Sequence, residues 1–189
     1  MTEKLKYAII GAGCMGQEHI LNIEIIDDAE VVALCDTSEK SIKESLDLLN
    51  NDVAIFDNYI DLVEANIADA FIIATPNFTH IEVLKEVMKS EAHLLIEKPL
   101  CTTVKDCQEF EKLAVDYPGV IWTAMEYRYM PPVQRMIKEI HNKTIGDLKM
   151  LSIREHRFPF LHKVDDWNRF AIKTGGTLVE KCCHFFDLM

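Results

Sequence analysis

Short apolar runs alternate with amphipathic segments of helical length along the first two thirds of the chain. Runs of strand length occupy residues 7–10, 31–35, 70–74, 93–96 and 120–123, with a weaker run at 54–56. Between them, apolar residues recur at helical spacing over residues 15–26, 38–49, 59–65, 78–89 and 104–115. Strands that alternate with helices are typical of a parallel sheet covered by helices on both faces. The pattern therefore predicts a doubly wound α/β domain over residues 1–123.

The second of these helices has a clear start and a predicted buried face. Ser38 is suited to cap it, because a serine hydroxyl can accept a backbone N–H of the first helical turn. Ile42, Leu46 and Leu49 fall on one side of the helix. We expect this stripe to pack against the sheet.

The pattern changes after residue 123. A helix is predicted at 130–141, a long strand with interspersed polar residues at 147–158, a loop at 158–173, and a helix at 177–189 after Gly175-Gly176. These elements indicate the beginning of an α+β domain with an open antiparallel sheet over residues 124–189. One strand and a few helices bury little surface, so we expect this second domain to be incomplete.

Composition and charge exclude several classes of partner. Against 20 Lys and Arg the chain carries 31 Asp and Glu, a formal net charge of −11, which opposes binding to a phosphate backbone. No apolar run approaches the roughly 18 residues that span a bilayer, and the first residues lack a signal-peptide pattern. We therefore expect a cytoplasmic protein that binds neither nucleic acid nor membrane.

The cysteines predict reduced thiols rather than a metal site. None of the six forms a CxxC pair, and most lie in apolar segments where a thiol behaves as a small hydrophobic group. Cys182, Cys183 and His184 are consecutive, so on a helix their side chains would diverge by ~100° each and would converge poorly on zinc. We predict no metal.

A glycine-rich turn follows the first predicted strand. Gly11, Gly13 and Gly16 form a GxGxxG pattern between that strand and a helix, which is the context in which the pattern binds dinucleotides. The first glycine makes the turn, the second admits pyrophosphate, the third lets the helix pack closely, and backbone N–H groups of Cys14 and Met15 would help to hold the phosphate. A glycine-rich turn without a ligand is the alternative interpretation.

An acidic residue lies at the end of the second predicted strand. Asp36 comes 20 residues after Gly16, as expected of a carboxylate that accepts hydrogen bonds from an adenosine ribose. A 2′-phosphate there would meet Asp36 and Glu39 with Lys40 as the compensating cation, so NAD is favoured over NADP. A methyltransferase could use a similar acidic residue for its ribose.

The triplet Glu97-Lys98-Pro99 ends the apolar run at 93–96. Proline prevents the strand from continuing, and the carboxyl end of a parallel strand opens into the crevice where such sheets bind ligands. Lys98 would therefore face a cofactor or a substrate. A strand-end lysine paired with a nearby acid remains the alternative.

The order of these motifs resembles a known family. The glycine pattern, Asp36, Thr75-Pro76-Asn77-x-x-His80 and Glu97-Lys98-Pro99 together resemble the glucose-fructose oxidoreductase and inositol dehydrogenase family (Gfo/Idh/MocA). His19 also fits its pattern, and a histidine that packs the helix is the alternative for it. The resemblance implies a Rossmann domain in which Thr75, Pro76, Asn77, His80, Glu97 and Lys98 contact the cofactor. Capping or packing roles for Asn77 and His80 remain equally open.

In relatives the lysine of this triplet lies near the nicotinamide, and the peptide bond that precedes the proline is cis. Side chains of neighbouring strand residues point to opposite faces, so Glu97 is not expected to neutralise Lys98. The resemblance thus assigns Lys98 the polarisation of a substrate oxygen, and it implies a cis bond between Lys98 and Pro99.

The second signature of the family spans residues 175–187. On a continuous helix Glu180, His184 and Asp187 would share one face, with His184 as the general base that takes a substrate hydroxyl proton. Relatives usually carry aspartate in place of Glu180 and a small residue in place of Lys181. Lys181 either contacts substrate or pairs with a neighbouring acid.

Two further residues enter as candidate substrate contacts. Arg128 lies in the passage from the last predicted strand into the second domain, where a hinge salt bridge is an equal alternative. Trp167 lies in the predicted loop at 158–173, a region that in relatives helps to form the pocket.

These residues predict an NAD(P)-dependent oxidoreductase that interconverts a secondary hydroxyl and a ketone on a sugar, polyol or inositol-like molecule. The alternative is a non-catalytic or truncated dinucleotide-binding protein, a sensor or a partner-dependent fragment. The resemblance also implies homo-oligomers formed through the sheet of the second domain.

Overall fold

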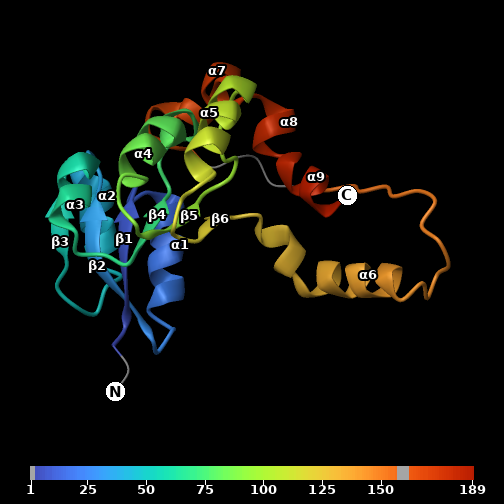
Figure 1. The fold of residues 1–189 in the computed structure, drawn as a ribbon, viewed down its shortest axis with the longest axis horizontal. Coiled ribbons are helices and arrows are strands. Elements are labelled where there is room, and N and C mark those ends of the chain that lie inside the picture. The colour runs from blue at the N-terminus through green and yellow to red at the C-terminus, as the bar shows by residue number, and fades with distance from the viewer. Residues whose placement is uncertain (1–2, 157–161) are drawn as a thin grey trace.

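The computed structural model describes residues 3–156 and 162–189, and its centre is a six-stranded parallel sheet (Figure 1). The strands lie in the order β3-β2-β1-β4-β5-β6, so the order reverses direction between β1 and β4. Their bounds are β1 Leu5–Ile10, β2 Ala29–Cys35, β3 Ala54–Phe56, β4 Ala70–Ile73, β5 His93–Ile96 and β6 Ile121–Thr123. This topology confirms the predicted doubly wound α/β fold, and its reversal point is where such sheets bind ligands.

Helices cover both faces of the sheet, and each face has its own core. One face packs against α1 through Ile20 and Ile23 and against α2 through Ile42. The other packs against α3, α4 and α5 through Leu62, Leu84 and Phe110. The helices are α1 Cys14–Ile23, α2 Glu39–Leu46, α3 Tyr59–Ala65, α4 His80–Val87 and α5 Val104–Ala114. Side chains of Ser38, Asn58 and Thr103 cap α2, α3 and α5. These caps and apolar faces explain why helices form between the strands.

The predicted stripe of α2 is confirmed in part: Ile42 and Leu49 pack against the core on the α1 side of the sheet, but Leu46 does not. Leu46 is 40% exposed, whereas Ser41 and Ser45 are the buried residues of this helix. Ser45 Oγ donates a hydrogen bond of 2.9 Å to the carbonyl oxygen of Ala12 in the glycine-rich turn. Small side chains let α2 approach that turn closely, and this approach rotates Leu46 away from the core.

The part after β6 is mostly helical. It comprises a 3-10 helix Glu126–Tyr129, α6 Pro131–His141, a 3-10 helix Val164–Arg169, α7 Ala171–Thr174, α8 Thr177–Glu180 and α9 Cys183–Leu188. Figure 1 shows α6 projecting away from the sheet, and no residue of α6 is buried. The predicted helix at 130–141 is thus confirmed.

Two predicted elements of this part differ from the structure. Residues 147–156 form no strand, and 157–158 lie outside the described residues. Ladder hydrogen bonds need a neighbouring strand, and the described part of the chain offers none to this segment, so the expected antiparallel sheet does not begin here. The loop expected at 158–173 contains short helices from Val164 onward, and its residues 158–161 lie outside the described ranges.

The helix predicted over residues 177–189 is interrupted. It forms as α8 and α9, separated by Lys181 and Cys182, and φ widens to −112° at Lys181. A continuous helical face through Glu180, His184 and Asp187 therefore does not exist. Glu180 ends one helix, and the other two residues lie on the next.

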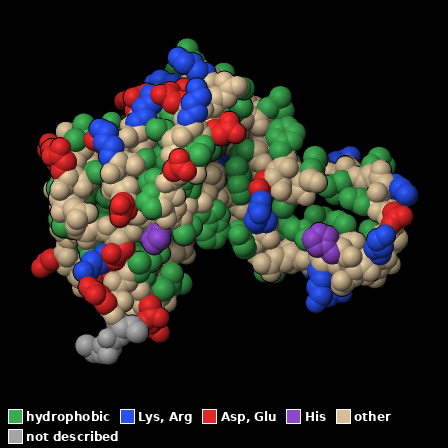
Figure 2. Space-filling model, viewed as in Figure 1, with side chains coloured by type: hydrophobic (Ala, Val, Ile, Leu, Met, Phe, Trp, Pro, Cys, Tyr) green, Lys and Arg blue, Asp and Glu red, His purple; other side chains and the backbone are tan. Residues whose placement is uncertain are grey.

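The surface carries mixed charge. Figure 2 shows acidic and basic side chains interspersed over the visible face of the Rossmann domain. Within residues 3–156 and 162–189, no helix combines the length and apolar character needed to cross a bilayer. The six cysteines are free thiols.

Candidate cofactor and active site

The carboxyl ends of the central strands meet at one edge of the sheet. Gly11 N donates to Cys35 O at 2.8 Å, Ala74 N to Ile10 O at 2.8 Å, and Glu97 N to Ile73 O at 2.9 Å. These bonds place the glycine-rich turn, the Thr75-Pro76-Asn77 turn and the Glu97-Lys98-Pro99 triplet next to one another. The three motifs lie far apart in sequence, and they thus lie side by side at the carboxyl edge of the sheet.

The glycines of the turn have different roles. A Cβ on Gly11, where φ is +98°, would lie 2.6 Å from the carbonyl of Ala74, and a Cβ on Gly16 would lie 2.1 Å from Gly11 O. Both positions therefore need glycine for close packing. A Cβ on Gly13 would meet nothing within 4 Å.

Gly13 is also the N-cap of α1, and no side chain caps that helix. Cys14 and Met15, the first two residues of α1, are exposed. The first N–H groups of a ten-residue helix and its dipole favour an anion, and the space beside Gly13 admits one. These residues fit the pyrophosphate of a dinucleotide.

Asp36 is fixed beside this turn. Its Oδ2 accepts a hydrogen bond from Ala12 N and its Oδ1 one from Ser38 N, both at 2.8 Å. Each carboxylate oxygen keeps a lone pair for a further donor. Lys40, the nearest cation in sequence, lies 3.6 Å from Glu44 on α2. Both side chains of this pair are largely exposed, so the contact is weak, whereas the Asp36 carboxylate is fixed in place by two backbone donors.

The turn after β4 contains a buried amide that no described residue satisfies. Asn77 is 7% exposed, and its Nδ2 has no hydrogen-bond partner among the described residues. An unpaired buried amide is costly, so a ligand that accepts this hydrogen bond would be favoured here. Thr75 and Pro76 precede it, and the hydroxyl of Thr79 donates to Pro76 O at 2.8 Å. This turn fits a cofactor contact.

His80 lies behind that turn, inside the protein. Its side chain is fully buried, with Nε2 3.0 Å from Thr75 O and Nδ1 3.0 Å from Pro99 O. Burial lowers the pKa of His80, although the surrounding carbonyl groups oppose this shift. With no exposed surface, the imidazole connects the turns after β4 and β5 instead of lining the crevice.

The triplet after β5 sends its first two side chains to different partners. Glu97 Oε1 lies 2.8 Å from His19 Nε2 on α1, whereas Lys98 Nζ lies 3.4 Å from the carbonyl oxygen of Glu180 on α8. The peptide bond between Lys98 and Pro99 is cis, which confirms the prediction. Lys98 therefore joins the edge of the sheet to the second signature.

Cys183 is a neighbour of Lys98 that the sequence analysis considered only as a zinc ligand, a role it did not favour. Its Sγ lies 3.6 Å from Glu180 O, the same carbonyl oxygen that Lys98 approaches. Burial raises the pKa of the Cys183 thiol, and the positive charge of Lys98 acts in the opposite direction. Cys183 lies within the second signature, but its place beside Lys98 depends on the interruption between α8 and α9.

His184 is buried against the 3-10 helix that follows β6. It is 2% exposed, its ring stacks on Tyr127 with centroids 4.0 Å apart and planes 6° apart, and its Nε2 lies 3.6 Å from Glu126 Oε1. The sequence predicts no role for Glu126 or Tyr127, the two residues that contact this imidazole. The stacking explains how the imidazole is held.

The predicted substrate residues separate into three groups. Arg128 and Asp187 bind each other, with Arg128 Nε 2.9 Å from Asp187 Oδ2 and a second contact from Nη2, and so fasten α9 to the 3-10 helix. Trp167 packs edge-on against Phe78, with ring centroids 6.4 Å apart. Lys181 is half-buried in the interruption between α8 and α9.

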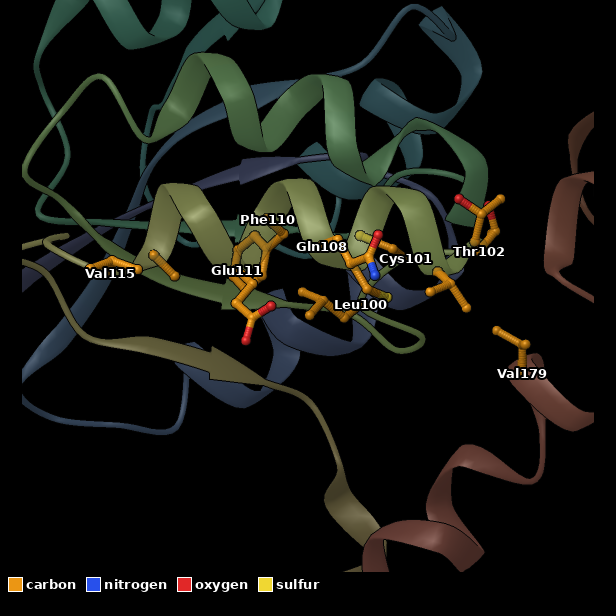
Figure 3. Close-up of a pocket in the computed structure, with 12 residues that line it drawn as sticks. Leu100, Cys101, Thr102, Gln108, Phe110, Glu111, Val115 and Val179 are labelled. Atoms are coloured by element: carbon orange, nitrogen blue, oxygen red, sulfur yellow. The ribbon is translucent and has the colours of Figure 1, made fainter.

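A separate hollow lies beside α5, away from the Lys98 region. An apolar groove of about 680 Å³ runs along α5, with Val179 of α8 facing that helix across it (Figure 3). Among the described residues that line it, Glu111 is the one with a charge. The candidate chemistry gathers at Lys98 and not in this groove. Within the described part of the chain, no group of three or more His, Cys, Asp or Glu is arranged to hold a metal.

Comparison with known proteins agrees with this geometry. The model of the "Oxidoreductase family, NAD-binding Rossmann fold" matches residues 5–125, and that of the "Oxidoreductase family, C-terminal alpha/beta domain" matches residues 137–189. The chain therefore belongs to the Gfo/Idh/MocA oxidoreductase family. The domain boundary at residues 123 and 124 stays a prediction.

Individual relatives support the same assignment. Rhizopine catabolism protein MocA of Rhizobium meliloti is 24% identical, over 98% of this chain and 56% of that protein. Myo-inositol 2-dehydrogenase of Thermotoga maritima is 26% identical, over 97% of this chain and 53% of that protein. A solved structure of a putative myo-inositol dehydrogenase from Sinorhizobium meliloti has a TM-score of 0.81 at 23% identity, over 98% of this chain and 54% of that protein. The chain spans about half the length of the relatives it matches.

Proposed function

We propose that this chain is an NAD-dependent oxidoreductase, which interconverts a secondary hydroxyl and a ketone on a sugar, polyol or inositol-like substrate. The observation that carries the proposal is the 3.4 Å contact between Lys98 Nζ and Glu180 O. It joins the two signature segments of the family at the end of β5. Named inositol dehydrogenases among the relatives support the substrate class.

The crevice supplies the cofactor groups from three turns. Gly13 and the start of α1 would hold the pyrophosphate, Asp36 the adenosine ribose, and Asn77 a polar group near the nicotinamide. NAD is proposed over NADP because the fixed carboxylate of Asp36 would repel a 2′-phosphate. When bound, the nicotinamide supplies the acceptor or donor of the hydride.

Lys98 and His184 divide the remaining work. The Lys98 ammonium would stabilise negative charge that develops on the substrate oxygen as hydride transfer proceeds. His184 would accept the hydroxyl proton, and Glu126, whose side chain is 55% exposed and 3.6 Å from His184 Nε2, could pass it to solvent. Glu180, Lys181 and Trp167 stay proposed substrate contacts, whereas Arg128 and Asp187 would position α9 through their ion pair.

A second candidate function is dinucleotide binding without turnover. The burial of His184 favours it, because a base that is 2% exposed must move before it can reach a substrate hydroxyl. The two candidates share every cofactor contact and differ only in the step after binding.

Turnover of a Lys98→Met variant distinguishes them. Lys105→Met is the matched control, because Lys105 is an exposed lysine on α5. Each protein is incubated with NAD and a panel of polyols and sugars, the nicotinamide absorbance is followed, and NADH binding is titrated separately. We expect Lys98→Met to lose about 100-fold or more in kcat with NADH affinity within a few fold, and Lys105→Met to match the unmodified chain. Full turnover in Lys98→Met would refute the role of Lys98, and NADH binding without turnover in the unmodified chain would favour the second candidate.

A further inference from the structure

The buried carboxylate of Glu97 connects α1, the helix that follows the glycine-rich turn, to Lys98 of the proposed active site. The Glu97 side chain is 9% exposed and that of His19, its partner on α1, is 17% exposed. Glu97 Oε1 lies 2.8 Å from His19 Nε2, and Glu97 Oε2 accepts a hydrogen bond from Lys98 N at 3.2 Å. The two oxygens of one carboxylate thus hold a residue of α1 and the backbone of Lys98 at the same time.

The orientation of Glu97 depends on these hydrogen bonds. Its backbone is fixed by the sheet, since Glu97 N donates to Ile73 O at 2.9 Å, but that bond leaves the side-chain torsions free. A carboxylate removed from water is stable only when donors satisfy it. His19 is the side chain that supplies a donor to Oε1 in this structure, and its bond keeps Oε2 directed at Lys98 N.

Packing of α1 does not require His19. Ile20 and Ile23 of the same helix are 0% and 4% exposed, and Gly16 brings α1 against the turn that begins with Gly11. These contacts anchor the helix in the core on the α1 side of the sheet. A polar residue at position 19 that reaches across to β5, 78 residues later in the chain, therefore has a separate task.

We propose that His19 is a positioning residue for Lys98 and acts through the Glu97 carboxylate. The bond from Lys98 N to Glu97 Oε2 fixes the backbone from which the lysine side chain leaves the strand, and the ammonium then reaches Glu180 O. The same histidine lies on α1, the helix proposed to hold the cofactor pyrophosphate. One carboxylate would thus fix the position of the catalytic lysine relative to the helix that binds the cofactor. This inference rests on the proposed role of Lys98.

Two substitutions separate positioning from packing. His19→Gln keeps a side-chain N–H donor at a similar distance from the backbone, whereas His19→Leu keeps the bulk and removes the donor. The primary measurement is amide hydrogen exchange at Lys98, followed by NMR on the full chain without cofactor. The amide of Ala124, which donates to Ile96 O at 2.8 Å in the neighbouring strand, serves as the internal reference.

We expect amide exchange at Lys98 to accelerate about tenfold or more in His19→Leu, and to stay within about threefold of the unmodified chain in His19→Gln. The reason is that only His19→Leu removes the donor to Glu97 and so frees Glu97 Oε2 from Lys98 N. Exchange at Ala124 should not change. Equal exchange at Lys98 in both variants would overturn the proposal. If His19→Leu fails to fold, His19→Asn, whose amide is too short to reach Glu97, replaces it in the comparison.

Kinetics supply the second measurement. We expect kcat to fall about tenfold in His19→Leu with KM for NAD within about twofold, and His19→Gln to restore most of it. Unchanged kcat in His19→Leu would overturn the positioning role. If the unmodified chain has no turnover, the proposed function fails, while the exchange comparison still decides whether His19 fixes the backbone of Lys98.

Discussion

Replacing the glycines of the phosphate-binding turn one at a time should separate folding from cofactor binding. An alanine at Gly16 would place its Cβ 2.1 Å from Gly11 O, so α1 would have to retreat from β1 by roughly 1 Å. We expect this overpacking to cost about 3 kcal/mol, which lowers the unfolding midpoint by roughly 6–12 °C for a chain of this size. Gly16→Ala should therefore lose stability and NAD affinity together.

An alanine at Gly13 should behave differently. Its Cβ would meet nothing within 4 Å, and the backbone there, at φ −78° and ψ −163°, suits any residue. We expect the free energy of unfolding to fall by no more than about 1 kcal/mol, the usual range for an N-cap change. The methyl group would fill the approach to the first N–H groups of α1, and the loss of one charge-assisted hydrogen bond, about 2 kcal/mol, predicts roughly 30-fold weaker NAD binding.

Thermal unfolding followed by circular dichroism and titration of NADH fluorescence measure the two effects on the same samples. The reasoning would be refuted if Gly13→Ala bound NADH as tightly as the unmodified chain. It would equally be refuted if the two variants had the same unfolding midpoint.

Three further perturbations test other parts of the account. Asp36→Asn should weaken NAD binding about tenfold and leave NADP binding unchanged or stronger, since the charge that repels a 2′-phosphate is removed. If the assignment is wrong, parallel titrations would give the same ratio of NAD to NADP affinity in the variant and in the unmodified chain. Arg128→Ala and Asp187→Asn should each destabilise the chain by about 1 kcal/mol or less, because Arg128 is half-exposed, and a double-mutant cycle without coupling would contradict the ion pair. Burial lowers the pKa of His80, so the unfolded chain binds a proton more readily as pH falls below the ordinary value of 6.5. The unfolding midpoint should therefore rise as pH is raised toward 6.5 and gain nothing further from His80 above it, and His80→Gln should lack this component of the slope in parallel thermal scans.

Much of the fold was predictable because strand ends and helix caps are local signals. The strands at 54–56 and 93–96 and the helix at 59–65 have the predicted bounds, and Ser38 caps α2 as expected. Within the predicted stripe of α2, the burial of Leu46 alone was wrong, and the reason is tertiary. Two serines allow α2 to approach the glycine-rich turn, and helical periodicity carries no information about that approach.

The later part of the chain was less predictable because its elements depend on neighbours. Residues 147–156 have a strand-like pattern, but pairing requires a second strand, which no pattern within the segment supplies. The interruption at Lys181 and Cys182 is likewise invisible in a sequence that keeps helical spacing on both sides of it. The motifs were sufficient to predict Lys98 as a site residue. The stacking of His184 on Tyr127 and the position of Cys183 are visible only in the structure.

Transfer of deuterium from substrate to cofactor tests the central claim most directly. The chain would be incubated with NAD and an inositol or polyol carrying deuterium on its CH–OH carbons, and the nicotinamide product analysed by mass spectrometry. The account predicts NADH that carries one deuterium, formed by the unmodified chain and Lys105→Met and lost in Lys98→Met. NADH without deuterium, or equal label from the Lys98→Met variant, would contradict it.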